Sequence, residues 1–435
     1  MVVYVIILFA LACLGILMAV PVIRLLESRP HILVGIVVLL FVVAAFFSSG
    51  QLPIVVLGGI TINPLDVICP VLLVLAFPYF FFRLCKGFSR TDALLLLLLL
   101  WSLILGFNYI VGLKTFGLQV ATNEFRSYFY IICAVYYVAS RDVHLMWEKM
   151  EKFWLFGAIC LFFFAAVSLS DGDFSRGGRP IDSTHTLFIL QAMVIGLFMQ
   201  VRGHLHPYFI PLLVAFFPML IVLQHRSVWV VMIFTGIMVF WKLPIVRARF
   251  VKWGLIGLIV FGGLGAVVFG DALLGALADS YEEAVGGQSS ESNSTWGWRL
   301  QGWGDLLTGE QMESLRDMFL GNPFGTGWER TVLTSDGVSQ VRTESPHNFY
   351  LQTLLRSGLI GLGAFLALHG MVIRKLMYCA RRNVSLSAVS LCIAVLILAQ
   401  LVYYIPYGSD YIQAILLGSA ISWIRYCETM KLAEV

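Results

Sequence analysis

Long apolar segments recur along almost the whole chain, and they constrain its fold more than any other feature. A membrane-spanning helix needs about 20 mainly apolar residues. Only 12% of the residues are charged, against roughly 25% in a typical soluble domain. The composition therefore predicts an all-α polytopic membrane protein of about 12–13 transmembrane helices, with residues 1–435 forming a single integral membrane domain. The expected segments lie near residues 1–20, 31–49, 65–82, 92–108, 125–139, 153–169, 186–200, 208–223, 228–241, 253–270, 349–372, 384–404 and 411–424.

The distribution of basic residues predicts the orientation of these helices. When alternate loops are assigned to the two sides, one side receives 19 of the 29 basic residues but only 7 of the 25 acidic ones. The positive-inside rule makes that side cytoplasmic. The N-terminus is then external and the C-terminus internal. The opening stretch, Met1–Val20, lacks a basic n-region and a cleavage signal, so we expect it to remain as a membrane helix.

One external connection, residues 271–346, is about 76 residues long and far exceeds an ordinary loop. Within it, Thr295–Leu307 places tryptophan and leucine side chains near one face at helical spacing. This spacing predicts an amphipathic helix on the membrane surface or over a cavity. Gly321–Gly327 is rich in turn residues and is not expected to be helical. The loop closes with Pro346-His347-Asn348 at the start of the next apolar segment.

Four arginines and a histidine are expected near membrane level on the external side, in separate segments that can converge: Arg126, Arg179, Arg226, Arg299 and His347. A single external arginine is more often a snorkelling anchor than a ligand. In combination, however, planar and permanently charged guanidinium groups suit phosphate oxygens. An imidazole with a reference pKa of about 6.5 suits proton transfer. The set predicts a phosphate-binding site that includes a proton acceptor.

Neither a metal site nor a disulfide framework is predicted. The eight cysteines lie within apolar segments or at their ends, without metal-ligand spacing. The nearest approach to a carboxylate metal site is Asp171-Gly172-Asp173, which is not convincing. We expect no metal, no other cofactor and no nucleic-acid partner.

Four motifs, taken in order, resemble those of the O-antigen ligase and O-antigen polymerase family. Pro346–Leu362, PHNFYLQTLLRSGLIGL, resembles the family's HN-x-YL-x-x-L-x-x-x-G-L-I-G-L signature. Gly297–Leu306, GWRLQGWGDL, is similar to its Arg-x-x-x-Trp segment, and Leu320–Gly327 to its Gly-x-Pro-x-Gly-x-Gly stretch. Leu223–Trp229 is similar to its short Ser-Arg-containing turn. The resemblance covers roughly residues 180–370, whereas the first half of the chain matches only as a helical membrane region.

The sequence departs from the family pattern at two places. His225-Arg226-Ser227 stands where the family often has Ser-Arg-Gly, which leaves the backbone geometry of that turn open. Arg356 stands where the family commonly has an acidic residue. A positive charge just inside the membrane is costly unless it is paired or faces a polar cavity.

The resemblance implies a metal-independent, inverting glycosyltransferase of the bacterial inner membrane, with the helical membrane core of lipid-dependent glycosyltransferases. It implies that the active site faces the periplasm, where residues 271–346 form the long loop. The implied partners are an undecaprenyl-diphosphate-linked glycan donor, a glycan or lipid-linked sugar acceptor, the lipid bilayer and other polysaccharide assembly proteins.

Each candidate residue has an expected role in such a site. His347 and Arg299 are the catalytic candidates, with His347 accepting the proton of the attacking hydroxyl. Arg226 and Arg299 are expected to bind the diphosphate, with Arg179 and Arg126 next. Trp303 is expected either to stack on a sugar ring or to anchor the loop.

Three functions remain open at this point. The preferred one is polymerisation of O-antigen or exopolysaccharide repeat units, and the second is ligation of the finished glycan to lipid A core. A secondary transporter is the alternative from another class. It would show broken helices that pair between two inverted halves, whereas the interruptions at Pro64, Pro70 and Pro78 have no counterparts.

Overall fold

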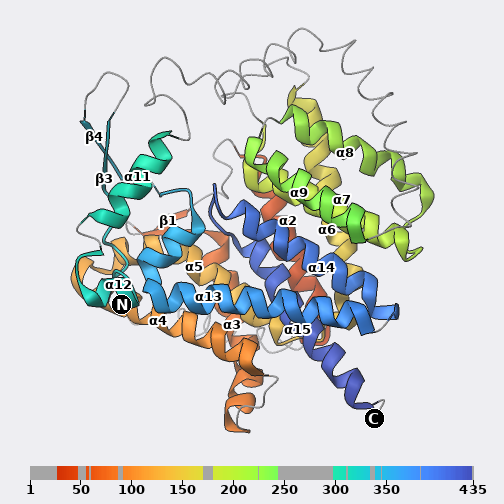
Figure 1. Ribbon diagram of the computed structural model, residues 1–435, viewed down its shortest axis with the longest axis horizontal. Coiled ribbons are helices and arrows are strands. Elements are labelled where there is room, and N and C mark those ends of the chain that lie inside the picture. The colour runs from red at the N-terminus through yellow and green to blue at the C-terminus, as the bar shows by residue number, and fades with distance from the viewer. Residues whose placement is uncertain are drawn as a thin grey trace, which may run out of the picture.

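The computed structural model describes residues 27–47, 55–57, 60–86, 92–169, 180–223, 225–242, 297–309, 312–333, 339–343, 345–382 and 384–433 as a bundle of helices (Figure 1). The longer helices are α2 (Pro30–Ala44), α3 (Pro64–Cys85), α4 (Ala93–Phe116), α5 (Leu118–Ala139), α6 (Val143–Leu169), α7 (Ser183–Val201), α8 (Ile210–Val222), α9 (Arg226–Lys242), α13 (Phe349–Arg382), α14 (Val384–Tyr403) and α15 (Tyr411–Ala433). The shorter ones are η2 (Pro207–Phe209), α11 (Gly297–Thr308) and α12 (Leu315–Leu320). Two short antiparallel hairpins complete the described part, β1 (Val55–Leu57) with β2 (Ile60–Ile62) and β3 (Arg330–Leu333) with β4 (Ser339–Arg342).

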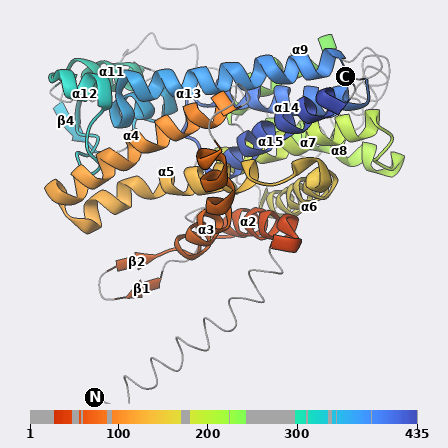
Figure 2. The same cartoon turned by 90° about the horizontal axis from the view of Figure 1, so that it is seen from below.

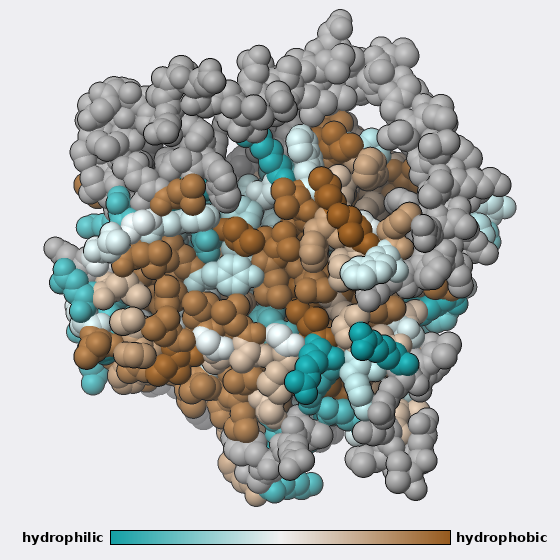
Figure 3. Space-filling view, in the orientation of Figure 1, coloured by the Kyte–Doolittle hydropathy of each residue, from teal (hydrophilic) through white to brown (hydrophobic). Residues whose placement is uncertain are grey.

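The chain is a helical, multi-pass membrane protein, as the sequence predicts. Six helices of the described part are long and apolar enough to cross a bilayer, within α3, α4, α6, α7, α13 and α14. Each apolar segment expected from the sequence coincides with a helix, except those near 1–20 and 253–270, which lie outside the described residues. Apolar side chains cover much of the surface drawn in Figure 3, as a hydrocarbon environment requires.

Helices α5 and α15 form the inner part of the bundle although neither is among the six candidate membrane-spanning helices. They pack along each other, and the second half of α5 is buried from Tyr128 onward apart from Phe129. Figure 2 shows α4, α5 and α13 running side by side, with α2 and α3 below them. The polar residues of α5 lie in its first half, which is exposed or half-buried, whereas the buried second half is mainly apolar and aromatic.

The helices alternate in direction between two ends of the bundle. At one end, here called the loop end, lie α11, α12 and the β3–β4 hairpin. The opposite end, here called the basic end, holds ion pairs between Arg83 and Asp92 at 2.9 Å and between Arg202 and the buried Glu151. Arg425 also donates hydrogen bonds there to backbone carbonyl groups. The two ion pairs join consecutive helices, and Arg425 joins α15 to the end of α5, at the end where the sequence places most of the basic residues.

Helix α13 bends where α12 packs against it. Gly358 interrupts the helix with φ 63° and ψ −172°, a conformation that only glycine adopts readily. A Cβ atom at this position would collide with the backbone of Phe319 in α12. Gly321, which follows α12, has φ +83°, and its Cβ would lie 2.5 Å from the carbonyl carbon of Arg356. The bend therefore depends on two glycines that permit a close approach of two backbones.

We expect Gly358→Ala to lower the thermal midpoint of the purified protein. The backbone strain alone costs roughly 1–3 kcal/mol, and the collision with Phe319 adds to it. Gly363→Ala is the matched control on the same helix, because a Cβ there meets no atom within 4 Å. Fluorescence-detected size-exclusion chromatography after heating measures both variants, and equal midpoints would contradict this account of the bend.

Candidate functional site

The candidate histidine lies where the long loop enters α13. Asn348 caps this helix, since its side-chain Oδ1 accepts a hydrogen bond from the amide of Leu351 at 3.0 Å. The amide of Phe349 donates to the carbonyl of Tyr404 at 2.9 Å, which joins the start of α13 to the end of α14. His347 itself has φ 48°, the left-handed region that side chains other than glycine rarely adopt. The backbone of His347 is therefore held in a fixed, strained conformation between two anchored residues.

Helix α11 packs against this entry point. The indole Nε1 of Trp303 donates a hydrogen bond of 2.7 Å to the carbonyl of Pro346. The sequence left open whether Trp303 anchors the loop or contacts a sugar, and this bond gives it an anchoring contact. The expected amphipathic helix over 295–307 is observed as α11, Gly297–Thr308.

Arg299 and His347 meet at a common neighbour, Tyr407, in the loop between α14 and α15. The Arg299 guanidinium lies 5.7 Å from the centre of the Tyr407 ring, and the His347 ring centre lies 6.4 Å from it at a steep angle. Arg299 also donates a 3.4 Å hydrogen bond to the carbonyl of Pro406. Arg299, Trp303, His347 and Tyr407 are called the Tyr407 cluster below.

The structure places the other predicted arginines differently. Arg226 begins α9, directly after His225, whose Nε2 donates to the carbonyl of Ile181 at 3.0 Å. Arg126 in α5 forms an ion pair of 3.2 Å with Asp66, so its charge is largely compensated. Arg179 lies outside the described residues.

A chain of tyrosines leads from the Tyr407 cluster into the bundle. Tyr407 stacks on Tyr403, with ring centres 5.0 Å apart and planes inclined by 16°. The Tyr403 hydroxyl donates a 2.9 Å hydrogen bond to Oγ of Ser183, the first residue of α7. The α14–α15 loop is thereby tied to the beginning of α7.

A contact between the buried His185 and the partly exposed Asp182 stabilises that beginning of α7. The N-cap residue Asp182 accepts hydrogen bonds from the amides of Thr184 and His185. Nδ1 of His185 lies 2.8 Å from Oδ1 of Asp182, and its Nε2 lies 2.9 Å from the carbonyl of Phe41. Carboxylate and carbonyl oxygens accept hydrogen bonds, so a His185 ring with a proton on each nitrogen would satisfy both contacts.

Asp410, which precedes α15, adds a second carboxylate near this pair. Its Oδ1 accepts a 2.9 Å hydrogen bond from the amide of Gln413, and its Oδ2 has no hydrogen-bond partner among the described residues. Burial, together with the neighbouring Asp182, raises the pKa of Asp410 to about 6, although the hydrogen bond from the Gln413 amide and the nearby His185 act to lower it. An ionised Asp410 is therefore unfavourable in the folded protein compared with the unfolded chain.

Two parts of this arrangement escaped the sequence analysis. Tyr407 was passed over, although Pro406-Tyr407-Gly408 is an aromatic turn between two apolar segments on the same side as His347. The role of Asp410 as a helix cap is signalled by its position directly before an apolar run. Neither sequence signal shows which residues of other helices Tyr407 and Asp410 contact.

Among the described residues, no group of three histidine, cysteine or acidic side chains is arranged to hold a metal ion. Asp171 and Asp173, the nearest candidate in the sequence, lie outside the described residues. The chemistry available from the described site is that of guanidinium, imidazole, phenol and indole groups.

These features define a class: a multi-pass helical membrane protein with a cationic and aromatic cluster at one end, assembled from an extended loop and several helix ends. Residues 211–366 match the family model Wzy_C, whose description is O-antigen ligase. This stretch, about a third of the chain, is similar to that O-antigen ligase family, as the ordered motifs indicated. No curated protein matches the chain.

Asp410→Asn is expected to stabilise the protein above about pH 6. Asparagine also caps helices but carries no charge to bury. Because the pKa of Asp410 is about 6 in the folded state and about 3.9 in unfolded chains, the wild type loses stability as the pH rises from 4 to 6. The thermal midpoint of the variant should exceed that of the wild type at pH 7.5, and the difference should vanish near pH 4. A difference independent of pH would contradict the assignment.

Proposed function

We propose that the protein transfers a glycan from a lipid-linked diphosphate to a hydroxyl group of a second glycan. The observation that supports this most is the meeting of Arg299 and His347 at Tyr407, because they come from two of the family-like motifs. The family match implies glycosyltransferase activity on lipid-linked glycans. A guanidinium beside an imidazole meets both needs of such a reaction, an anion stabiliser and a proton acceptor.

In the proposed reaction the acceptor hydroxyl oxygen attacks the anomeric carbon of the donor sugar. A new carbon–oxygen bond forms while the bond between the anomeric carbon and the diphosphate oxygen breaks. The electron pair of that bond stays with the lipid diphosphate, and the hydroxyl proton passes to His347. Attack from the face opposite the leaving group inverts the anomeric configuration in a single displacement.

The arginines stabilise the charge that grows on the diphosphate. Fixed cationic donors act most strongly where they replace water in a site of low dielectric. Arg299 is assigned this role first, together with Arg226 and then Arg179. Arg126 contributes least, because Asp66 already compensates its charge. Trp303 holds α11 in place through Pro346.

We propose the bacterial inner membrane as the location, with the loop end facing the periplasm. Basic residues concentrate at the opposite end, which the positive-inside rule assigns to the cytoplasm. A lipid-linked donor then presents its diphosphate at the level of the Tyr407 cluster. Other proteins of polysaccharide assembly are the proposed neighbours in the membrane.

Replacing either member of the catalytic pair tests the assignment. His347→Ala and Arg299→Ala should each reduce glycan transfer by about 100-fold or more, while both variants elute as folded protein in detergent. The assay uses purified protein with a lipid-diphosphate-linked glycan and follows chain growth on gels. Wild-type turnover by the two folded variants would remove them from the mechanism.

The acceptor separates polymerase from ligase, and we propose a polymerase of O-antigen or exopolysaccharide repeat units. A strain lacking the protein should then make glycans of a single repeat unit. Accumulation of long chains on the lipid carrier would instead assign the protein as the ligase that transfers finished glycan to lipid A core. The glycans of the deletion strain, with and without the restored gene, are compared by electrophoresis.

A further inference from the structure

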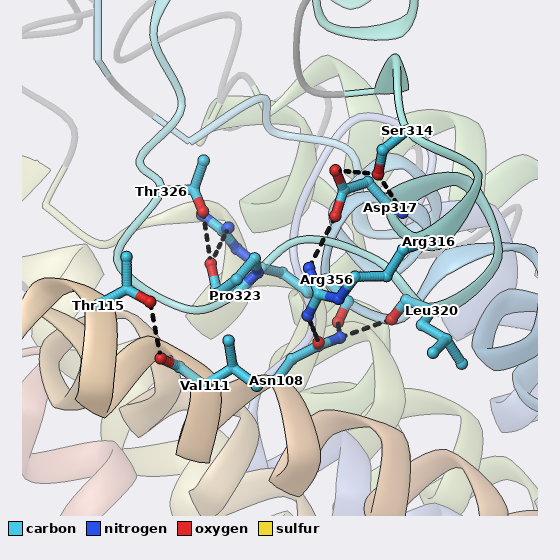
Figure 4. A network of polar contacts seen from close by, with 10 residues as sticks. All are labelled: Asn108, Val111, Thr115, Ser314, Arg316, Asp317, Leu320, Pro323, Thr326 and Arg356. Atoms are coloured by element: carbon cyan, nitrogen blue, oxygen red, sulfur yellow. Dashed lines mark hydrogen bonds and ion pairs between the residues drawn. The ribbon is translucent and has the colours of Figure 1, made fainter.

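The segment between α12 and β3 lies against the middle of a membrane helix. Asn108 of α4 donates side-chain hydrogen bonds to the carbonyls of Leu320 at 2.5 Å and Arg356 at 3.0 Å (Figure 4). The amide of Phe324 donates to the Asn108 carbonyl at 3.3 Å, and the Phe324 side chain is buried. Asn108 precedes the end of α4 by eight residues, which is about 12 Å along a helix. Non-helical backbone at such a depth is tolerated only where protein satisfies its polar groups.

An ion pair between α5 and α13 satisfies this backbone. Arg356 and Glu124 are 2.7 Å apart, and the arginine side chain is fully buried. Arg356 donates to the carbonyls of Pro323 at 3.0 Å and Gly327 at 2.9 Å. Glu124 accepts from the amides of Gly325 at 2.7 Å and Gly327 at 3.0 Å. The pair binds both the carbonyl groups and the amides of the segment, and its charges compensate each other.

The same arginine contacts the tryptophan that supports α11. The Arg356 guanidinium lies 4.1 Å from the centre of the Trp328 ring, close enough for a strong cation–π interaction. Trp328 packs against a small apolar cluster shared by α11 and α13, formed by Leu306, Leu351 and Leu355 with Trp303 beside them. Helix α11 also packs on strand β3, which begins two residues after Trp328. One indole thus connects the buried ion pair to the helix that carries Arg299.

We propose that Glu124 and Arg356 are a positioning pair for the transfer reaction: they hold the 321–327 segment and Trp328, and thereby fix α11 and Arg299 relative to His347. This proposal rests on the proposed function for its catalytic consequence. A displacement of about 1 Å at a catalytic group can cost 100-fold in rate. The loop therefore needs a rigid attachment, and the pair supplies it where the backbone is irregular.

The guanidinium is required for its shape as well as its charge. It reaches a carboxylate, two carbonyl groups and an aromatic face at once, using its planar fork. A lysine keeps the charge but offers a single compact ammonium group. Arg356→Lys should therefore loosen the segment although the ion pair with Glu124 persists.

The first measurement follows the position of α11 without any assay of activity. Trypsin cleavage after Arg299, inside α11, is slow while the helix is docked and faster when it undocks, since proteases cut locally opened chains. Arg356→Lys and Glu124→Gln should accelerate this cleavage about 10-fold. Glu428→Gln is the matched control, because it breaks an ion pair of 2.8 Å made by the same helix α13 at the basic end. It should leave the cleavage unchanged.

The second measurement is the kinetics of glycan transfer. Both variants should lower kcat by about 10- to 100-fold while KM for the donor changes less than about threefold, because a displaced Arg299 loses contact mainly with the charge that develops in the transition state. The control Glu428→Gln should retain both constants. Folded variants with normal protection of α11, or with rapid cleavage but unchanged kcat, would overturn the positioning role.

A charge-reversed double variant tests whether an ion pair alone is sufficient or whether the backbone contacts of Glu124 and Arg356 are also needed. Glu124→Arg with Arg356→Glu restores an ion pair but exchanges the donors and acceptors offered to the backbone. We expect neither protection nor kcat to recover, and full recovery would overturn the proposal. If Arg356→Lys fails to fold, Glu124→Gln and Trp328→Leu carry both measurements. If the wild type transfers no glycan, the proposed function fails, while the cleavage rates still decide whether the pair holds α11.

Discussion

In hydrocarbon a backbone amide or carbonyl group has no water to bind, and the architecture of this protein depends on that constraint. Most of the chain satisfies it by forming helices, whose backbone hydrogen bonds are internal. The 321–327 segment cannot do so, because its glycines and proline do not support a helix. Asn108, Glu124 and Arg356 supply the missing partners from three different helices. An irregular segment can therefore lie at membrane depth in this protein only because buried polar side chains bind its backbone.

The geometry of the candidate site depends on this attachment of the 321–327 segment to the helices. The loop supplies Arg299 and Trp303 from α11, the start of α13 supplies His347, and the α14–α15 loop supplies Tyr407. None of these elements carries the site alone. Their relative position depends on a few bonds between distant segments, such as the one from Trp303 to the Pro346 carbonyl. A cluster assembled in this way is sensitive to changes far from the reacting atoms.

The sequence predicted the features that rest on local pattern. The apolar segments, the amphipathic α11 and the motif around His347 could be predicted because each depends on the order of neighbouring residues in the sequence. Contacts between side chains of different helices produce no such local pattern. Arg126 was predicted to bind a ligand because its ion-pair partner Asp66 is distant in the sequence. Arg356 looked like an isolated charge in the membrane, and its partner Glu124 lies in a different helix in the first half of the chain. Tyr407 was missed because its importance comes only from the two side chains that meet on it.

The close approach at Gly321 and Gly358 has a consequence for the order of assembly. The ribosome makes α12 and the 321–327 segment before α13, yet the segment binds to α13 through Leu355 and Arg356. The part of its binding surface that α13 provides therefore does not exist until α13 has been synthesised, whereas Asn108 and Glu124 belong to the earlier helices α4 and α5. The candidate site is completed later still, because Tyr407 lies in the loop between α14 and α15. The order of these steps is set by the positions of the segments in the chain.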